Sequence, residues 1–505
     1  MKFNNYSIVI LTLVYFVISL IGIQHHELWL DESHHWLLAR DSSSFLELIK
    51  NTRYEGHPIL WNILLYQITR FTLNPFWMQF LHILISTTVV FIFLKKAPFN
   101  WIFKTLFIFG YFMLFEYNII SRNYILGVLI LFLAALSFRN REKNFIKICI
   151  YLVIASNIHL MFSVIAFALF LTLLFERYQN KKFDKSMLIG TSLFLLGLIL
   201  AAIQITPPND TLFFNRIDQI SFHEKFIKGY ISLFKGLITI PDFRTIHFWN
   251  SNVLVNISKP LASFLGLICY FIPLIFFIKK KKILFFVYLA LLGTQVFFFA
   301  TQLGATRYDG MTYIIIIIAL WIENYYNEEG NSKLIDANNS FKLNLLKNIL
   351  IYSILIVQFF SGIYAYAMDV KHPFCVAKET VEYLNKNKIS TQNVLSITCD
   401  GTLISPFLEK KVYFLCDNSL QSYCNWNSGC GTEVSNEKII KMISNFMTYN
   451  NNATYVSTFQ ITDNLQKNIW VKTNDQVMVR FFKKFDNSII RNADYYIYEI
   501  KKIKK

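Results

Sequence analysis

Charged residues are scarce in this 505-residue chain: Asp, Glu, Lys and Arg make up 16% of it. A soluble domain carries about 25% of such residues. Hydrophobic residues instead make up 54% of the sequence. They gather in repeated runs of roughly 20, the length that crosses a hydrocarbon core of about 30 Å. The composition therefore predicts a polytopic membrane protein.

Several signals of other protein classes are missing. The first apolar segment, 6–23, lacks a small-x-small cleavage site, so we expect a retained first helix. The chain has no internal repeat, no low-complexity tract and no CxxC pair. Its net charge of +17 comes from Lys and Arg residues that lie between the apolar runs. These residues form no motif of the kind that binds a nucleic-acid groove. We therefore predict membrane lipids as partners and no nucleic acid.

We expect about eleven transmembrane helices, which form an all-α polytopic membrane domain over residues 1–366. The segment 58–71 is too short for a span, and we predict a helix that lies at the interface with Arg70 at its polar end. The expected spans are 6–23, 76–94, 101–116, 123–138, 145–158, 160–175, 187–205, 254–278, 283–301, 311–326 and 346–366.

Loop charge predicts the orientation of these spans. Clusters of Lys and Arg follow the second, fourth, sixth and eighth spans, and all fall on one side if 58–71 does not cross. The positive-inside rule makes that side cytoplasmic. The outward-facing segments are then 25–57, 117–122, 206–252, 302–310 and the tail from about residue 367.

The tail, 367–505, changes character. It is polar, with short β-rich runs and helical patterns at 376–387 and 434–448, which predicts a soluble extracytoplasmic α/β domain. Four cysteines that could form disulfides in an oxidising compartment cluster there, with a zinc site as the weaker alternative. They are Cys399, Cys416, Cys424 and Cys430.

The first outer loop, 25–57, is dense in polar residues beside the bilayer. Asp31 and Glu32 follow the first helix closely, and a helical pattern covers 32–49. On composition alone, a solvated loop explains these acids equally well. The adjacent His34 and His35 would point about 100° apart on a helix, which favours structural or substrate contacts over a zinc site.

Two motifs in this loop resemble a known family. W-x-D-E-x-x-H-W at 29–36 and E-G-H-P-x-L at 55–60 resemble the GT-C glycosyltransferases, and most closely the bacterial relatives of the polyprenyl-phosphate-mannose protein mannosyltransferases and the aminoarabinose transferases. The resemblance covers residues 1–330 in layout. It implies a GT-C fold in a bacterial inner or cell membrane. It also implies inverting transfer of a sugar from a polyprenyl-phosphate donor to a protein, lipid or polysaccharide acceptor outside the cytoplasm.

The resemblance also implies roles for individual residues. Asp31 matches the catalytic acid of the first loop, and Glu32 is the neighbouring acid, which could instead bond the following helix. A carboxylate with a usual pKa of about 4 is ionised at neutral pH and can accept the proton of an attacking hydroxyl. We therefore predict Asp31 and Glu32 as the catalytic pair, with Asp31 preferred as the base.

Two arginines lie in later outer segments, Arg122 in FEYNIISRNY and Arg307 in GATRYDGMTY. Guanidinium groups would bind the phosphate of a lipid-linked donor, whereas the alternative is a contact with lipid headgroups. The second loop has no Asp-x-Asp or Asp-x-Glu, so no motif supports a metal, and we predict no cofactor. The predicted substrate-binding residues are Glu55, His57, Glu116, Arg122, Asn123, Arg307 and Tyr308.

Other interpretations remain open on the sequence. Asn157 and His159 interrupt an apolar stretch, either as a functional polar pair or as a tight turn. A transporter or flippase of lipid-linked sugars is the main alternative function, and it predicts mid-span charges and inverted repeats. A non-catalytic assembly protein whose tail binds a partner is another.

Overall fold

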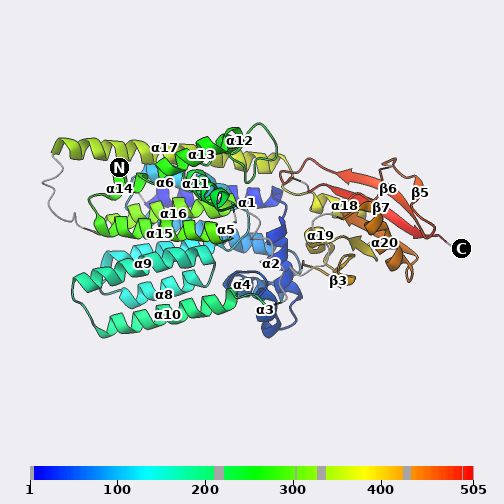
Figure 1. Cartoon of the computed structure of the whole chain (residues 1–505), viewed down its shortest axis with the longest axis horizontal. Helices are drawn as coiled ribbons and strands as arrows, with labels where there is room; N and C mark the ends of the chain where they lie inside the picture. The colour runs from blue at the N-terminus through cyan, green and yellow to red at the C-terminus, as the bar shows by residue number, and fades with distance from the viewer. Residues whose placement is uncertain are drawn as a thin grey trace.

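The computed structural model describes residues 5–209, 221–301, 304–326, 337–424, 434–463, 465–491 and 493–503. Long helices run side by side in a bundle, and a smaller domain with all the described strands lies at one end of it (Figure 1). We call this end of the bundle the domain end and the opposite end the far end. Three short helices lie between bundle and domain: α2 (Leu30–Asp41), α3 (Phe45–Thr52) and α4 (Leu60–Thr69).

Seven of the described helices are long and apolar enough to cross a membrane, as in a multi-pass membrane protein. Two shorter apolar helices, α7 (Tyr124–Ser137) and α8 (Phe145–Ser156), lie among them. The predicted total of about eleven spans is not confirmed. The seven are α1 (Asn5–His25), α5 (Phe76–Lys96), α9 (Leu160–Gln179), α10 (Lys185–Ile205), the stretch Lys259–Phe277, α15 (Lys281–Thr301) and most of α17 (Ala337–Lys371).

Breaks in the helices explain part of the difference. The expected span 101–116 divides into α6 (Trp101–Ile108) and the π-helix η1 (Phe112–Glu116). At the break, α17 approaches so closely that a Cβ on Gly362 would lie 2.6 Å from the carbonyl oxygen of Phe109.

The expected span 254–278 is likewise divided. It forms α12 (Val253–Ile257), α13 (Lys259–Cys269) and α14 (Ile272–Phe277), and α13 and α14 each carry a proline in the first turn. Proline is tolerated there because the first helical N–H groups have no partner within the helix. Hydropathy alone does not reveal such breaks.

Helix α16 (Thr306–Glu323) forms the centre of the bundle. Its side chains are buried from Thr306 to Ile322, except for the half-buried Arg307. It packs against α7, α15 and α11 (Phe222–Leu237). The helix begins before the expected span 311–326, which brings Arg307 and the motif around it into the bundle.

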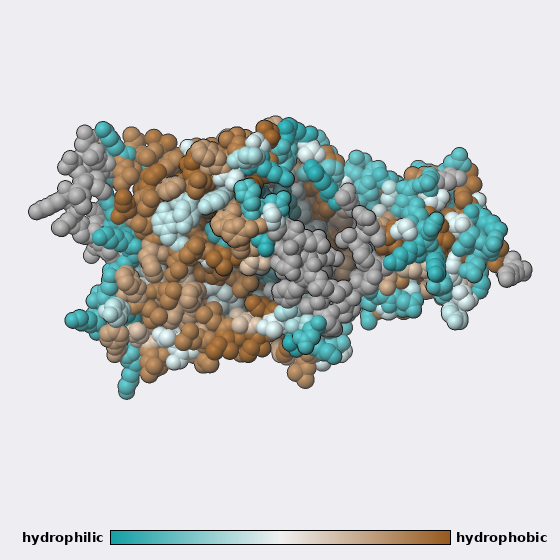
Figure 2. Space-filling view, in the orientation of Figure 1, coloured by the Kyte–Doolittle hydropathy of each residue, from teal (hydrophilic) through white to brown (hydrophobic). Residues whose placement is uncertain are grey.

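The predicted basic clusters lie at the far end. There Arg141 donates to Glu176 at 2.7 Å and to the carbonyl of Tyr325 at 3.0 Å, and Lys280 donates to the carbonyl of Tyr326. Figure 2 shows hydrophilic residues at this end, a broad hydrophobic band, and the hydrophilic domain at the other end. The segments that carry the predicted site lie at the domain end, opposite the basic clusters.

The predicted short helix over 58–71 is α4, which lies across the domain end and does not run along the bundle (Figure 1). Arg70 donates to the carbonyl oxygens of Ala39 at 3.0 Å and Arg40 at 2.7 Å. The guanidinium group of Arg70 thus bonds carbonyl oxygens of the last turn of α2, which have no partner within the helix. The predicted helix over 32–49 is interrupted between α2 and α3, where Ser44 accepts a 3.2 Å bond from the backbone of Glu47.

The C-terminal domain contains a seven-stranded sheet of order β3-β2-β1-β4-β7-β6-β5, in which β1 pairs in parallel with β2 and β4. The predicted α/β domain is confirmed, and α18 and α20 match the predicted helical patterns. Strands β3, β5 and β6 were not predicted. The elements are α18 (Ala377–Lys386), α19 (Asp400–Leu408), α20 (Asn436–Met447), β1 (Val394–Ser396), β2 (Val412–Phe414), β3 (Ser419–Gln421), β4 (Asn452–Ser457), β5 (Trp470–Lys472), β6 (Val477–Phe485) and β7 (Tyr495–Lys502).

Disulfides are present in this domain. Cys399 is bonded to Cys424, with Cα atoms 4.8 Å apart, and Cys416 is also disulfide-bonded. Cys430 lies outside the described residues. Within the described ranges, no group of three or more His, Cys, Asp or Glu residues is arranged to hold a metal ion.

Candidate functional site

Three predicted residues from distant parts of the chain meet at the domain end. Asp31 lies on α2, Arg122 precedes α7, and Arg307 lies in the first turn of α16. Arg122 donates through Nη1 to Oδ2 of Asp31, and Nη2 of Arg307 lies 3.4 Å from the same oxygen. The Arg122 side chain is 3% exposed and that of Asp31 is 22% exposed. Arg307 is 13% exposed, so Asp31 is the most exposed of the three side chains.

The start of α2 fixes this arrangement. Trp29 caps the helix, and its backbone N–H donates to Oε2 of Glu32 at 2.9 Å. The same tryptophan offers its ring to both guanidinium groups, with Cζ of Arg307 at 4.8 Å and Cζ of Arg122 at 5.9 Å from its centroid. Asp31 lies in the first helical turn, where the N–H groups favour a carboxylate.

Glu32 faces the interior, unlike Asp31. Besides the Trp29 N–H, it accepts from the backbone N–H of Ser121 at 2.6 Å and contacts Nε2 of His26 at 3.1 Å. It is fully buried. Its oxygens thus join the first outer loop to the loop before α7, which supports a scaffold role for Glu32 beside the more open Asp31.

His26 extends this connection to α17. Its Nδ1 lies 3.0 Å from a carboxylate oxygen of Asp369, opposite its contact with Glu32. Burial lowers the pKa of His26, but Asp369 and Glu32 outweigh burial and raise that pKa to about 10. A buried histidinium between two carboxylates therefore links α1, α2 and α17.

A second set of buried charges lies behind Arg307. Glu116 accepts from the hydroxyl of Tyr111 at 3.1 Å and from Nε1 of Trp249 at 3.2 Å. Lys235 on α11 forms an ion pair with Asp309 at 2.9 Å. Tyr117 donates to the backbone carbonyl of Arg307 at 2.7 Å.

The predicted Glu116 is thus buried beside the arginine pair. Asn123 donates to the carbonyl of Ile158 at 2.9 Å, which holds the α8–α9 turn. Sequence reasoning missed Lys235, Asp309 and the His26–Asp369 pair. The only signal was the isolated charges inside apolar stretches.

The predicted Glu55 and His57 lie on the other side of the arginine pair. Glu55 pairs with Nε2 of His34 at 2.6 Å. Burial raises the pKa of Glu55, but His34, together with His35 and His57, outweighs burial and lowers that pKa to about 2. His57 stacks on His159, with ring centroids 4.4 Å apart, and His159 lies 5.7 Å from Tyr308.

The alternative of a tight turn at Asn157 and His159 is confirmed in part. Asn157 ends α8 and donates to carbonyl oxygens of Val153 at 2.9 Å and Gly197 at 3.1 Å. His159 caps α9 by accepting from the N–H of Met161 at 3.0 Å. Its other ring nitrogen, Nε2, lies 3.4 Å from the hydroxyl oxygen of Tyr124.

Several buried polar atoms of the site have no hydrogen-bond partner among the described residues. They include Nε of Arg122, Nε of Arg307 and Nδ1 of His57. Buried donors and acceptors are normally satisfied, so these atoms are available to a ligand or to water.

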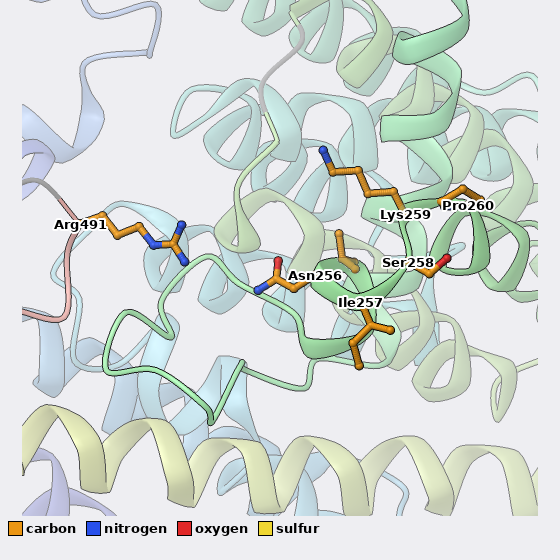
Figure 3. Close-up of a pocket in the computed structure, with 7 residues that line it drawn as sticks. Asn256, Ile257, Ser258, Lys259, Pro260 and Arg491 are labelled. Atoms are coloured by element: carbon orange, nitrogen blue, oxygen red, sulfur yellow. The ribbon is translucent and has the colours of Figure 1, made fainter.

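Two cavities are lined by residues other than Asp31, Arg122 and Arg307. One of 540 Å³ lies at the α12–α13 junction, where Lys259 and Arg491 lie on opposite sides (Figure 3). Another of 430 Å³ lies where α1 and α5 meet the domain, and His26 and Gln79 are among its lining residues.

Comparisons with protein-family models, with curated proteins and with solved structures found no match for the chain. Its function must therefore be inferred from the contacts described above.

Proposed function

We propose that this chain is a GT-C-type membrane glycosyltransferase that moves a sugar from a polyprenyl-phosphate donor to an acceptor at the domain end of the bundle. The observation that carries the proposal is the contact of Asp31 with both Arg122 and Arg307. The basic clusters at the far end support an extracytoplasmic domain end, because the positive-inside rule favours Lys and Arg on the cytoplasmic side.

The chemistry follows from this cluster. Guanidinium groups bind phosphate oxygens through paired hydrogen bonds, so a donor phosphate would compete with Asp31 for Arg122 and Arg307. The released carboxylate would then accept the proton of the acceptor hydroxyl. The hydroxyl oxygen forms its bond to the anomeric carbon while the bond from that carbon to the phosphate oxygen breaks. The arginines stabilise the charge that develops on the departing lipid phosphate.

The test is transfer of radiolabelled sugar from polyprenyl-phosphate donors in membranes that contain the Asp31→Asn or Asp31→Ala variant. Loss of a catalytic base lowers the rate by roughly 10²- to 10⁴-fold. The matched control is Glu47→Gln, because Glu47 lies in the same loop and its carboxylate accepts from the backbone and hydroxyl of the neighbouring Ser43. Insertion and yield should be unchanged in all variants, and full activity of Asp31→Asn would end the base assignment.

The same assay separates the transporter alternative. A flippase moves the lipid-linked sugar across the bilayer and leaves its phosphate bond intact. Release of free polyprenyl phosphate that depends on Asp31 supports the enzyme, whereas intact donor that has crossed the membrane supports transport.

A further inference from the structure

The cavity of 540 Å³ lies where the bundle meets the C-terminal domain, and the cluster of Asp31 with its two arginines does not line it. Its lining comes from the α12–α13 junction and from Arg491, which belongs to the connection between β6 and β7. Figure 3 shows the side chains of Lys259 and Arg491 directed into this space from opposite sides, with Asn256 between them. Two positive charges from distant parts of the chain therefore share one cavity.

The two charges have no counter-ion in the cavity, because its described lining residues include no carboxylate. Asn256 contacts one acid, Asp242, at 2.7 Å, but Asp242 is already paired with Arg244. Asp494, in the same connection as the lining arginine, is likewise paired with Lys484 at 2.9 Å. Like charges that share a cavity repel one another, and an anion placed between them attracts both. The lining therefore favours a negatively charged ligand.

The backbone segments that carry the two cations are held in place by packing. Ile490, directly before Arg491, donates its backbone N–H to the carbonyl oxygen of Phe374 at 3.2 Å, and Ile489 is buried in the core of the bundle. Lys259 begins α13, which packs closely against α11. The fold thus brings the two segments to opposite sides of the cavity without help from a ligand.

The cavity also lies at the start of a membrane span. Lys259 is the first residue of the candidate span Lys259–Phe277, which is long enough to cross a hydrocarbon core of about 30 Å. Ile257 at the cavity and Leu261 and Phe264 on α13 are exposed apolar residues. A cationic cavity beside an apolar surface that enters the bilayer fits a ligand with a charged headgroup and acyl chains.

We propose that this cavity binds the phosphate of an anionic phospholipid, with Lys259 and Arg491 on either side of the phosphate and the acyl chains along α13. The lipid would join α13 to the β6–β7 connection and so tie the C-terminal domain to the membrane surface. This inference depends on the place of α13 in the membrane and is independent of the proposed sugar transfer.

Native mass spectrometry of the purified full chain in detergent tests this proposal. The probes are dioleoyl phosphatidylglycerol, which is anionic, and dioleoyl phosphatidylcholine, which has no net charge. The wild type should bind phosphatidylglycerol about tenfold more tightly, because each Lys or Arg close to an anionic headgroup contributes roughly fivefold and both cations are partly screened by solvent. Equal affinity for the two lipids would overturn the inference.

The variants Lys259→Gln and Arg491→Gln identify the site. Each should reduce the preference for phosphatidylglycerol to about threefold or less, whereas Lys259→Arg should keep it. The matched control is Lys185→Gln, because Lys185 is likewise the exposed first residue of a candidate span, α10, at the far end. All the replaced side chains are exposed, so the fold should be kept. A loss in only one of the two Gln variants, or an equal loss in the control, would overturn the shared site.

Two further probes separate the possible sources of the phosphate. Glycerophosphoglycerol, the soluble headgroup, should not displace bound phosphatidylglycerol, because it lacks the acyl chains. Displacement at equal concentration would show a site for soluble anions and overturn the lipid assignment.

Farnesyl phosphate stands for the polyprenyl donor of the proposed function. Its affinity should be unchanged in the Lys259→Gln and Arg491→Gln variants and should fall in Arg122→Gln. A fall in the first two variants would assign the cavity to the donor and overturn the inference. An unchanged affinity in Arg122→Gln would count against the proposed function alone.

Discussion

Replacing Glu32 by Gln is expected to destabilise the domain end of the bundle, because Glu32 joins three segments there. Its carboxylate receives the N–H groups of Ser121 at 2.6 Å and Trp29 at 2.9 Å and contacts His26 at 3.1 Å. Glutamine keeps one acceptor oxygen, but its amide group directs N–H bonds toward partners that are themselves donors. The histidinium of His26 would then retain only Asp369 as a partner.

The magnitude follows from burial. Removing one partner of a buried ion pair costs about 3–5 kcal/mol. We expect a loss near the lower value, ~3 kcal/mol, because Asp369 still holds His26. A loss of 1 kcal/mol lowers the melting temperature of a mid-sized domain by about 2–4 °C, so the expected shift is roughly 6 °C or more.

The free cysteines provide the assay. Cys149, Cys269 and Cys375 are buried, so a fluorogenic thiol reagent added during heating reports unfolding of the purified protein. The matched control is Glu382→Gln, which removes an exposed carboxylate from α18. Melting of Glu32→Gln at the temperature of this control would refute the scaffold role.

The remaining predictions use the same melting assay. The pKa of His26 is about 10 in the folded protein and 6.5 in the unfolded chain. The stabilisation of the fold by protonated His26 is therefore full below about pH 6.5 and is lost as pH rises through about 10. The His26→Gln variant should abolish this pH dependence of the melting temperature. Gly310→Ala should lower the free energy of unfolding by about 1–3 kcal/mol, because its Cβ would lie 2.4 Å from a ring atom of Phe112 in η1. Gly304→Ala should leave stability unchanged, because its Cβ would have no atom within 4 Å. Removing the Cys399–Cys424 disulfide by serine substitution should cost about 3 kcal/mol, and unchanged melting without the bond would contradict this value.

The parts of the fold that follow from local pattern were predictable from the sequence. Apolar runs predicted the long helices, and the β-rich runs at 393–398, 410–415, 453–458 and 494–500 predicted β1, β2, β4 and β7. The break at 109–111, which divides one expected span, was not predictable, because it depends on packing between helices. A hydropathy pattern is equally apolar through a straight helix and through a broken one.

The site was predictable where a motif marked it. Asp31, Arg122 and Arg307 were each predicted from a motif as site residues, and in the structure they lie in contact. The ion pair of His26 with Asp369 was not predictable, because its partners are 343 residues apart and no pattern in a single sequence pairs them. Glu32 was grouped with Asp31 by position, although successive residues of a helix face different directions.

Helix α17 has a consequence for how the C-terminal domain is carried. It is a single helix of 35 residues, and Asp369, near its end, is tied to His26. Helix α19 also packs directly on α2. A flexible linker would let the domain sample many orientations, whereas a continuous helix with an ion pair at its end holds it in one. A molecule bound to the domain would therefore meet the loops from a constant direction and at a constant height.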